Sequence, residues 1–134
     1  MPTWDDVARV CLALPGTTEA VSARGRRRWV VRGRTFLRER PLHRKDLDEL
    51  GSAAPPGPVL VAYLPDEGAK AALLSAEPDR FFRTSHVDGT LMLMCRLDAL
   101  DEQSLRELAA EAWASRAPAA LVAAHPLGRD ETRP

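Results

Sequence analysis

The sequence is poor in several residue types that often reveal what a small protein does. It has two cysteines, three histidines and two lysines among 134 residues, and aromatic residues make up only 5% of it. Two widely spaced cysteines cannot form a disulfide framework, and no apolar run approaches the roughly 20 residues that span a bilayer. The N-terminus also lacks the basic and then apolar pattern of a secretory signal. We therefore expect a cytoplasmic protein with no membrane association.

Patterns of catalysis and cofactor binding are missing as well. No Gly-x-Ser-x-Gly frame holds a nucleophile, and no glycine-rich loop is placed to cradle a phosphate group. His43 and His125 have no carboxylate or thiol at metal-ligand spacing on a predicted helix or strand. Cys11 and Cys95 fit buried, reduced thiols. The sequence predicts a protein that is not an enzyme and that carries no cofactor and no metal.

The composition is that of a soluble globular domain, with 45% apolar and 28% charged residues. A chain of this length can bury one core but is too short for two ordinary domains. We expect residues 1–126 to form one domain and residues 127–134 to be a disordered tail.

The charge is zero overall but unevenly distributed. Residues 21–45 contain ten basic residues and one acidic residue, Glu39, so this window carries +9 and the rest of the chain −9. The basic residues are Arg24, Arg26, Arg27, Arg28, Arg32, Arg34, Arg38, Arg40, Arg44 and Lys45.

The N-terminal third predicts a helix and a β-hairpin. Thr3 is a good N-cap, and apolar residues then recur at helical spacing over residues 4–13. A connecting loop is expected from there to about Arg24. Two β-prone triplets, at 29–31 and 35–37, flank Arg32-Gly33-Arg34, where Gly33 supplies the positive φ of a tight turn. The basic window thus lies on and around a hairpin.

The remainder alternates between strands and helices. Residues 41–57 are rich in proline and glycine and predict an irregular connection, although a helical turn fits 46–50. A strand is expected at 59–64, a helix after Asp66, two antiparallel strands joined by Asp88-Gly89, a helix from Asp101 to Ala117 and an apolar turn at 119–124. The order α-β(2–3)-α-β(2)-α favours an α+β fold of two layers, with helices on one antiparallel sheet.

Several spaced motifs lie along residues 4–124. They are Leu12-Ala13-Leu14-Pro15-Gly16 with Glu19, Trp29 with Val31-Arg32-Gly33-Arg34 and Phe36, Pro78 with Phe81-Phe82 and His86, Leu97-Asp98, Glu111-Ala112-Trp113, Ala117-Pro118 and Leu121-Val122. Together these motifs resemble the MmcQ/YjbR-like family of small bacterial proteins. The resemblance implies a two-layer α+β fold similar to type III secretion chaperones. Proteins of this family are commonly labelled DNA-binding, through a proposed pair of wing-like elements. This sequence departs from the family pattern at Arg26-Arg27-Arg28 and at Ala119-Ala120.

The first functional hypothesis is a DNA-binding or other nucleic-acid-binding domain that uses the hairpin as a wing. Arginine presents a planar fork of donors that suits phosphate oxygens. If seven arginines all contacted duplex phosphates, log K would fall by about six units per log unit of salt. Neighbours on a strand face opposite sides, however, so a complete set is not expected. The seven are Arg24, Arg26, Arg27, Arg28, Arg32, Arg34 and Arg38.

Two further hypotheses concern other surfaces. A protein-interaction module would use an open sheet face, with Met92 and Met94 as an adaptable apolar surface. A small-ligand pocket would involve His86 and Trp29. Trp29 and Phe36 can stack bases in one interpretation and belong to the core in the other.

Overall fold

The computed structural model describes residues 2–125, and within them the chain forms five α-helices and one six-stranded sheet. The helices are α1 (Trp4–Leu12), α2 (Arg44–Leu50), α3 (Glu67–Ala76), α4 (Glu102–Arg116) and α5 (Ala119–Ala124). The strands are β1 (Thr17–Val21), β2 (Arg27–Val31), β3 (Arg34–Glu39), β4 (Val59–Tyr63), β5 (Phe81–Phe82) and β6 (Met92–Arg96), with short 3₁₀ turns at Gly51–Ala53 and Leu97–Ala99.

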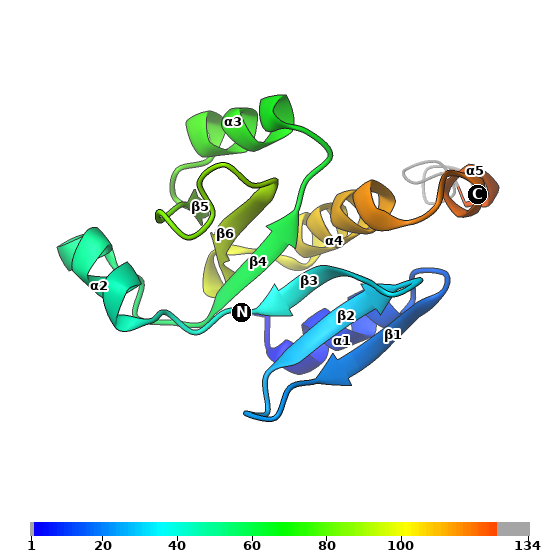
Figure 1. Ribbon diagram of the computed structural model, residues 1–134, viewed down its shortest axis with the longest axis horizontal. Helices are drawn as coiled ribbons and strands as arrows, with labels where there is room; N and C mark the ends of the chain where they lie inside the picture. The colour runs from blue at the N-terminus through cyan, green and yellow to red at the C-terminus, as the bar shows by residue number, and fades with distance from the viewer. Residues whose placement is uncertain (1, 126–134) are drawn as a thin grey trace.

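The sheet is antiparallel throughout, in the order β1-β2-β3-β4-β6-β5 (Figure 1). Its clearest local signal is the hairpin between β2 and β3. Arg32 and Gly33 have φ angles of 49° and 82°, the two left-handed residues that a two-residue hairpin turn needs. The predicted hairpin is confirmed, and so is the α+β class.

The main helices begin where the sequence predicts. The Thr3 hydroxyl accepts from the backbone N–H of Asp6, and the Asp6 carboxylate accepts in return from the backbone N–H of Thr3. Asp66 and Asp101 cap α3 and α4 in the same manner, by accepting from backbone N–H groups three residues later. Such caps satisfy amide groups that the first helical turn leaves free.

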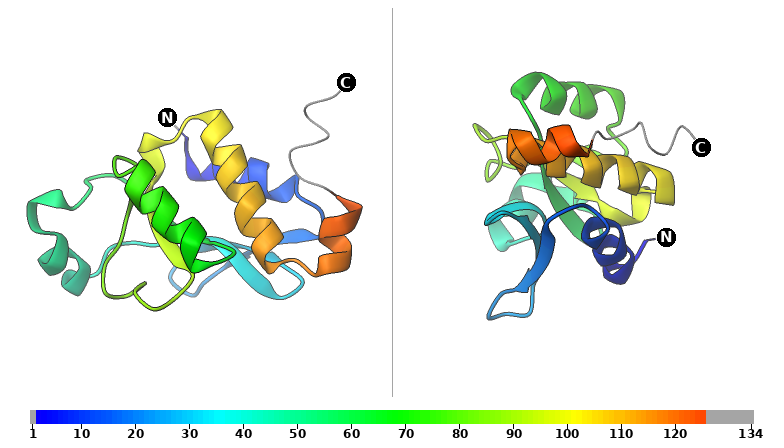
Figure 2. Two further views of the ribbon diagram at one scale, coloured as in Figure 1. Left: turned by 90° about the horizontal axis from the view of Figure 1, so that it is seen from above. Right: turned by 90° about the vertical axis from the view of Figure 1, so that its right-hand side faces the viewer.

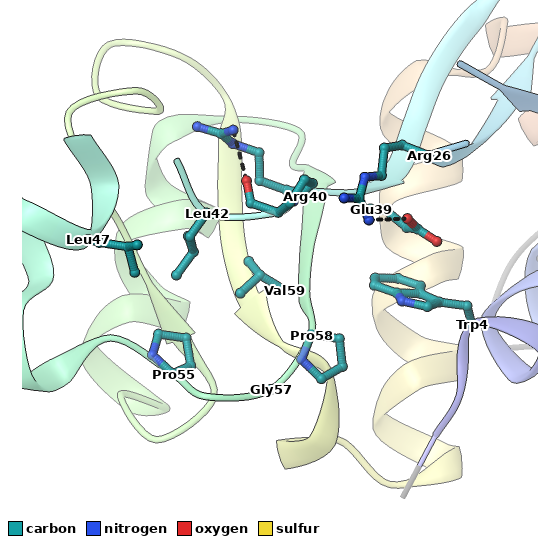
Figure 3. A pocket seen from close by; sticks show the side chains of 11 residues that line it. Trp4, Arg26, Glu39, Arg40, Leu42, Leu47, Pro55, Gly57, Pro58 and Val59 are labelled. Atoms are coloured by element: carbon teal, nitrogen blue, oxygen red, sulfur yellow. Dashed lines mark hydrogen bonds and ion pairs between the residues drawn. The ribbon is translucent and has the colours of Figure 1, made fainter. Parts of the chain in front are cut away.

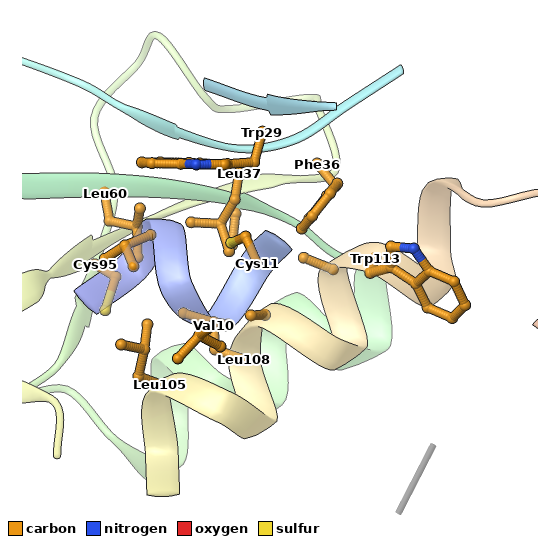
Figure 4. Close-up of a cluster of buried hydrophobic side chains, with 14 of the residues drawn as sticks. Val10, Cys11, Trp29, Phe36, Leu37, Leu60, Cys95, Leu105, Leu108 and Trp113 are labelled. Carbon is orange, nitrogen blue, oxygen red and sulfur yellow. The ribbon is translucent and has the colours of Figure 1, made fainter. Parts of the chain in front are cut away.

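The main core lies between one face of the sheet and the pair α1 and α4, which lie on the same side of it (Figure 2). Trp29, Phe36, Trp113 and the two cysteines are fully buried in this core (Figure 4). Burial raises the pKa of both thiols, that of Cys95 to about 12. The core interpretation of Trp29 and Phe36 is therefore correct, and neither ring is available to stack bases.

The opposite face of the sheet is covered over only part of its width. Residues in register across the strands on this face run from Ala20 through Arg28, Arg38, Val61 and Met94 to Phe82. The apolar end of this row forms a second, smaller cluster with Val87 and Leu50, which the 83–91 loop and α2 contribute. The end that carries the arginines has no such cover among the described residues.

A buried lysine fixes the 83–91 loop to α3. The Lys70 ammonium donates to the backbone carbonyls of Val87 and Thr90 at 2.7 and 2.8 Å. The Val87 carbonyl also accepts from the Thr90 amide and hydroxyl, whereas the Thr90 carbonyl has no other donor among the described residues.

Three predicted elements were wrong in detail. The loop expected before Arg24 contains β1, which supplies the edge of the sheet next to β2. The irregular segment 41–57 contains a two-turn helix, α2, before its prolines. Asp88-Gly89 forms a turn, but β5 and β6 are joined by a nine-residue loop rather than a tight hairpin. In each case a tertiary contact stabilises a segment whose local signal is weak.

The part of the chain that the structure describes holds no helix with the length and apolar character to cross a membrane. The tail predicted at 127–134 lies outside the described residues.

Candidate anion-binding groove

A concave, basic groove lies where β2 begins and β3 ends. Its cavity measures about 400 Å³ and is walled by the loop before β2, the two strand ends and the segment that leads into α2. Glu39 is the one acidic residue on its described lining. The basic residues that line it are Arg24, Arg26, Arg27, Arg28, Arg38, Arg40 and His43.

Two of these arginines face each other directly. Arg28 on β2 and Arg38 on β3 are register partners on the part of this sheet face that lies outside the apolar cluster formed with α2 and the 83–91 loop. Like charges at directly opposite positions destabilise a sheet. Neither guanidinium has a carboxylate within ion-pair distance in residues 2–125, and the same holds for Arg24 at the mouth of the groove. The positive charge here is concentrated and not neutralised.

Arg38 is partly buried beside Tyr63 and Arg40. Burial lowers the pKa of its guanidinium, the Tyr63 hydroxyl partly offsets that effect, and the charge of Arg40 lowers the pKa further. An anion beside Arg38 would favour the charged form, since opposite charges stabilise each other.

Other arginines of the window are already engaged. Arg27 donates to Glu19 at 3.1 Å and to Asp5 at 2.9 Å, and its guanidinium lies 5.8 Å from the Trp29 ring centroid. Arg26 is 3.8 Å from the Glu39 carboxylate. Arg27 thus ties the first strands to α1 and is not free to bind a ligand.

Arg32 and Arg34 are remote from the groove. They lie at the turn at the opposite end of the hairpin, where Arg32 follows Arg28 by four positions of extended chain, a length of about 13 Å. The seven arginines predicted as one nucleic-acid surface therefore form two separate groups. Arg24, Arg28 and Arg38 are the members that share the groove without carboxylate partners.

Arg40, which the sequence did not single out, is central to this region. Its guanidinium donates to the Asp46 carboxylate at 2.9 Å and to the Pro41 carbonyl at 3.2 Å, and both charged side chains are almost fully buried. A second contact, at 3.1 Å, joins Arg40 to the His43 ring. The ion pair of Arg40 and Asp46 anchors α2 to the end of β3, and Arg40 and His43 form one wall of the groove.

Asp46 is stabilised as a carboxylate despite its burial. Burial alone would raise its pKa, but hydrogen bonds from the His43 amide and the Thr84 hydroxyl, together with the charge of Arg40, outweigh that effect and lower it. The contact with Thr84 also joins α2 to the 83–91 loop.

The structure does not bring His86 and Trp29 together in one of the cavities described here. Trp29 is fully buried in the main core, whereas His86 is exposed on the 83–91 loop and lines neither of the cavities described here. Partial burial and the nearby charges of Arg40 and Arg38 lower the pKa of His86. His86 therefore senses the charge of the groove without forming part of its wall.

The apolar surface predicted from Met92 and Met94 is also not open. Met94 is fully buried in the smaller cluster and Met92 is partly buried against it. The part of this same face that remains uncovered carries Arg28 and Arg38.

The described residues contain no group of three or more histidine, cysteine or acidic side chains that could hold a metal ion. The groove consequently offers charge and hydrogen-bond donors, and these are the means of binding an anion.

Fold and groove together define a small α+β protein with helices on one side of an antiparallel sheet and a basic groove on the other. The YjbR family model matches residues 12–115. Two similar proteins are the uncharacterized protein Rv2570 of Mycobacterium tuberculosis and the uncharacterized protein Mb2600 of Mycobacterium bovis, each 39% identical over 127 residues, which cover 92% of this chain and 95% of the relative. The chain belongs to the YjbR family, which confirms the resemblance drawn from the spaced motifs.

Proposed function

We propose that this protein binds nucleic acid and that phosphate groups occupy the basic groove. The observation that carries the proposal is the cross-strand pair of Arg28 and Arg38, two guanidinium groups on an uncovered sheet face with no carboxylate partner in residues 2–125. A guanidinium fork matches the oxygens of a phosphate, and the contact is a charge-assisted hydrogen bond. A phosphate between the two arginines would turn a repulsive pair into an attractive site.

The groove suits a short stretch of backbone rather than a broad surface. Its volume of about 400 Å³ falls within the range of roughly 300–1,000 Å³ that ligand sites occupy. The net charge of the whole chain is zero, so attraction is local and long-range steering is weak. We therefore expect modest affinity that falls with salt.

Three of the seven arginines predicted from the sequence form the proposed nucleic-acid interface. Arg24, Arg28 and Arg38 contact phosphates, while Arg40 and His43 shape the wall of the groove beside them. Arg27 serves the fold through Glu19 and Asp5. Arg32 and Arg34, at the far end of the hairpin, contribute little.

The function is binding and not catalysis, and we place it in the cytoplasm. Two observations support this part of the proposal. The thiols of Cys11 and Cys95 are buried with raised pKa values, which makes them poor nucleophiles. Both are free cysteines, as is usual in reducing compartments.

The test is fluorescence anisotropy with a short labelled single strand and the corresponding duplex at low salt. The double variant Arg28→Gln/Arg38→Gln should weaken binding by at least about tenfold, which corresponds to about 1.4 kcal/mol. The matched control is Arg32→Gln/Arg34→Gln, which removes the same charge at the other end of the hairpin and should bind within about twofold of the wild type.

Two results would contradict the proposal. One is equal loss of binding in both double variants, because the charge of the whole hairpin would then matter rather than the groove. The other is the absence of binding to either nucleic acid together with binding to a polyglutamate peptide, which would assign the groove to an acidic protein segment.

A further inference from the structure

A second cavity adjoins the basic groove and differs from it in chemistry. This cleft, of about 230 Å³, lies between the start of α1 and the α2 segment (Figure 3). Its lining is mostly apolar and includes Trp4, Leu42, Leu47, Pro55 and Pro58. Arg26, Glu39, Arg40 and Pro41 line both cavities, so the cleft and the groove are continuous at that point.

Glu39 stands at this junction with its hydrogen-bonding capacity unused. The residue is only 9% exposed, and no hydrogen-bond donor reaches its carboxylate among residues 2–125. Its one charged neighbour, the Arg26 guanidinium, is 3.8 Å away, beyond hydrogen-bond distance (Figure 3). Asp46, the other buried carboxylate of this region, accepts from Arg40, His43 and Thr84. The Glu39 oxygens are not among the fully buried polar atoms without a partner, and Glu39 lines both cavities. Its carboxylate can therefore accept a hydrogen bond from a ligand in the cleft without displacing a protein donor among the described residues.

The surroundings of Glu39 define what kind of donor fits. Arg26 already balances its charge and Arg40 lies on the same wall, so an ammonium group would meet two guanidinium groups as well as the carboxylate. A neutral N–H donor avoids that repulsion. It also makes the charge-assisted hydrogen bond that Glu39 lacks.

Apolar side chains on both sides of the cleft indicate an apolar group behind that donor. The Trp4 ring lies next to the Glu39 carboxylate (Figure 3), and its own packing partner is Trp29, at 6.3 Å between ring centroids. Leu47 on the opposite wall is 47% exposed, an apolar side chain that a ligand would cover. The cavity is smaller than the roughly 300–1,000 Å³ of a complete small-molecule site, so it suits a single ring system.

We infer that the cleft receives one unstacked nucleobase with an exocyclic amino group, which donates a hydrogen bond to the Glu39 carboxylate. The inference rests on the proposed function, because the phosphates of the same strand occupy the adjoining groove. Carboxylates accept from the amino group of cytosine in this manner. Thymine instead presents a ring N–H between two carbonyl oxygens, which would repel Glu39. The protein therefore prefers single strands and distinguishes cytosine from thymine.

The experiment compares two labelled single strands of equal length, one of cytosine and one of thymine, and a mixed-sequence duplex. The wild type should bind the cytosine strand about tenfold more tightly than the thymine strand and more tightly than the duplex. In Glu39→Gln the difference in affinity between the cytosine and thymine strands should decrease to about twofold or less, while the affinity for the thymine strand is unchanged. Asp48→Asn, which removes one exposed negative charge from α2, is the matched control and should retain the preference.

Leu47→Asn provides a second variant that does not depend on Glu39. Leu47 is exposed on α2, so its replacement leaves the core intact. The substitution should weaken binding of the cytosine strand more than binding of the thymine strand. The wild type could bind the two strands with equal affinity and lose binding of both in Arg28→Gln/Arg38→Gln. That result would overturn the inference about the cleft, while the groove would still be the phosphate-binding site. Equal loss of both strands in a folded Glu39→Gln would also overturn it. If no strand binds the wild type, the proposed function itself fails.

Discussion

Arg28 and Arg38 occupy directly opposite positions on β2 and β3, on the part of the sheet face that lies outside the apolar cluster formed with α2 and the 83–91 loop. A cross-strand pair of like charges is a cost to the fold, and the surrounding described residues supply no carboxylate to offset it. Such local destabilisation is common where a surface serves binding rather than folding. The two effects can be separated, because stability and binding should respond to the same substitution in opposite directions.

Neutralising one member of the pair should stabilise the protein. We expect Arg28→Gln to raise the free energy of unfolding by about 0.2–1 kcal/mol, because the repulsion with Arg38 is removed. Urea denaturation followed by tryptophan fluorescence measures this change, with Arg34→Gln as an exposed control on the same hairpin. If Arg28→Gln loses stability and Arg34→Gln does not, Arg28 stabilises the fold. That result would contradict the claim that Arg28 destabilises the fold and serves ligand binding instead.

Breaking the buried ion pair should have a much larger effect. Asp46→Asn leaves the buried guanidinium of Arg40 without its counter-charge, and we expect a loss of about 3–5 kcal/mol at neutral pH. Asp48→Asn, exposed on the same helix, should change stability little. Because the pKa of Asp46 is lowered in the folded state, its stabilisation is present above pH 3.8 and is lost as the pH falls from there through the folded-state pKa. Unfolding curves of wild type and Asp46→Asn should therefore converge in acid, and a constant difference at all pH values would contradict this assignment.

His86 offers a reporter of groove occupancy. Partial burial and the charges of Arg40 and Arg38 lower its pKa in the free protein. Phosphate groups in the groove would offset those two charges, so the pKa of His86 should rise when a single strand binds. NMR titration of the imidazole with and without a saturating strand measures the shift. His125, at the end of α5, is the internal control, and a rise of equal size there would contradict binding at the groove.

Lys70 should be essential for ordering the 83–91 loop. Lys70→Met keeps most of the side-chain volume but leaves the carbonyl of Thr90 without its donor and removes one of three donors to the carbonyl of Val87, at a cost of about 1–3 kcal/mol. Hydrogen exchange of the loop amides should accelerate, whereas Lys45→Met, at an exposed position on α2, should leave it unchanged. Normal protection of the loop in Lys70→Met would show that the apolar contacts of Val87 suffice.

Most of the fold was predictable because its signals are local. Thr3, Asp66 and Asp101 mark helix starts through side-chain hydrogen bonds that span three residues, and Gly33 marks a turn through its φ angle. β1 was missed because Thr17–Val21 contains a charged residue, Glu19, whose role appears only in three dimensions. Glu19 accepts from the Trp29 indole at 2.9 Å and from Arg27, contacts that no pattern within the strand encodes.

The candidate site was predictable in composition but not in arrangement. An excess of arginine in residues 21–45 identified the basic segment, and strand alternation correctly predicted that Arg27 and Arg28 face opposite sides. The contribution of Arg40 could not be predicted, because it depends on Asp46 and Thr84, which approach it only after α2 and the 83–91 loop have packed. From the sequence, Glu39 was notable only as the one acidic residue in a basic window. Its place between the two cavities, with no hydrogen-bond donor among the described residues, is visible only in the structure.

The most direct test of the groove is the salt dependence of single-strand binding. Three phosphate contacts, from Arg24, Arg28 and Arg38, predict that log K falls with log salt with a slope of about −2. In Arg28→Gln/Arg38→Gln the slope should decrease in magnitude to about −0.7, while Arg32→Gln/Arg34→Gln should keep the slope of the wild type. The wild type could instead show a slope of about −5, which both double variants reduce equally. That result would show that all seven arginines of the segment contact phosphates, and it would contradict the groove as the binding site.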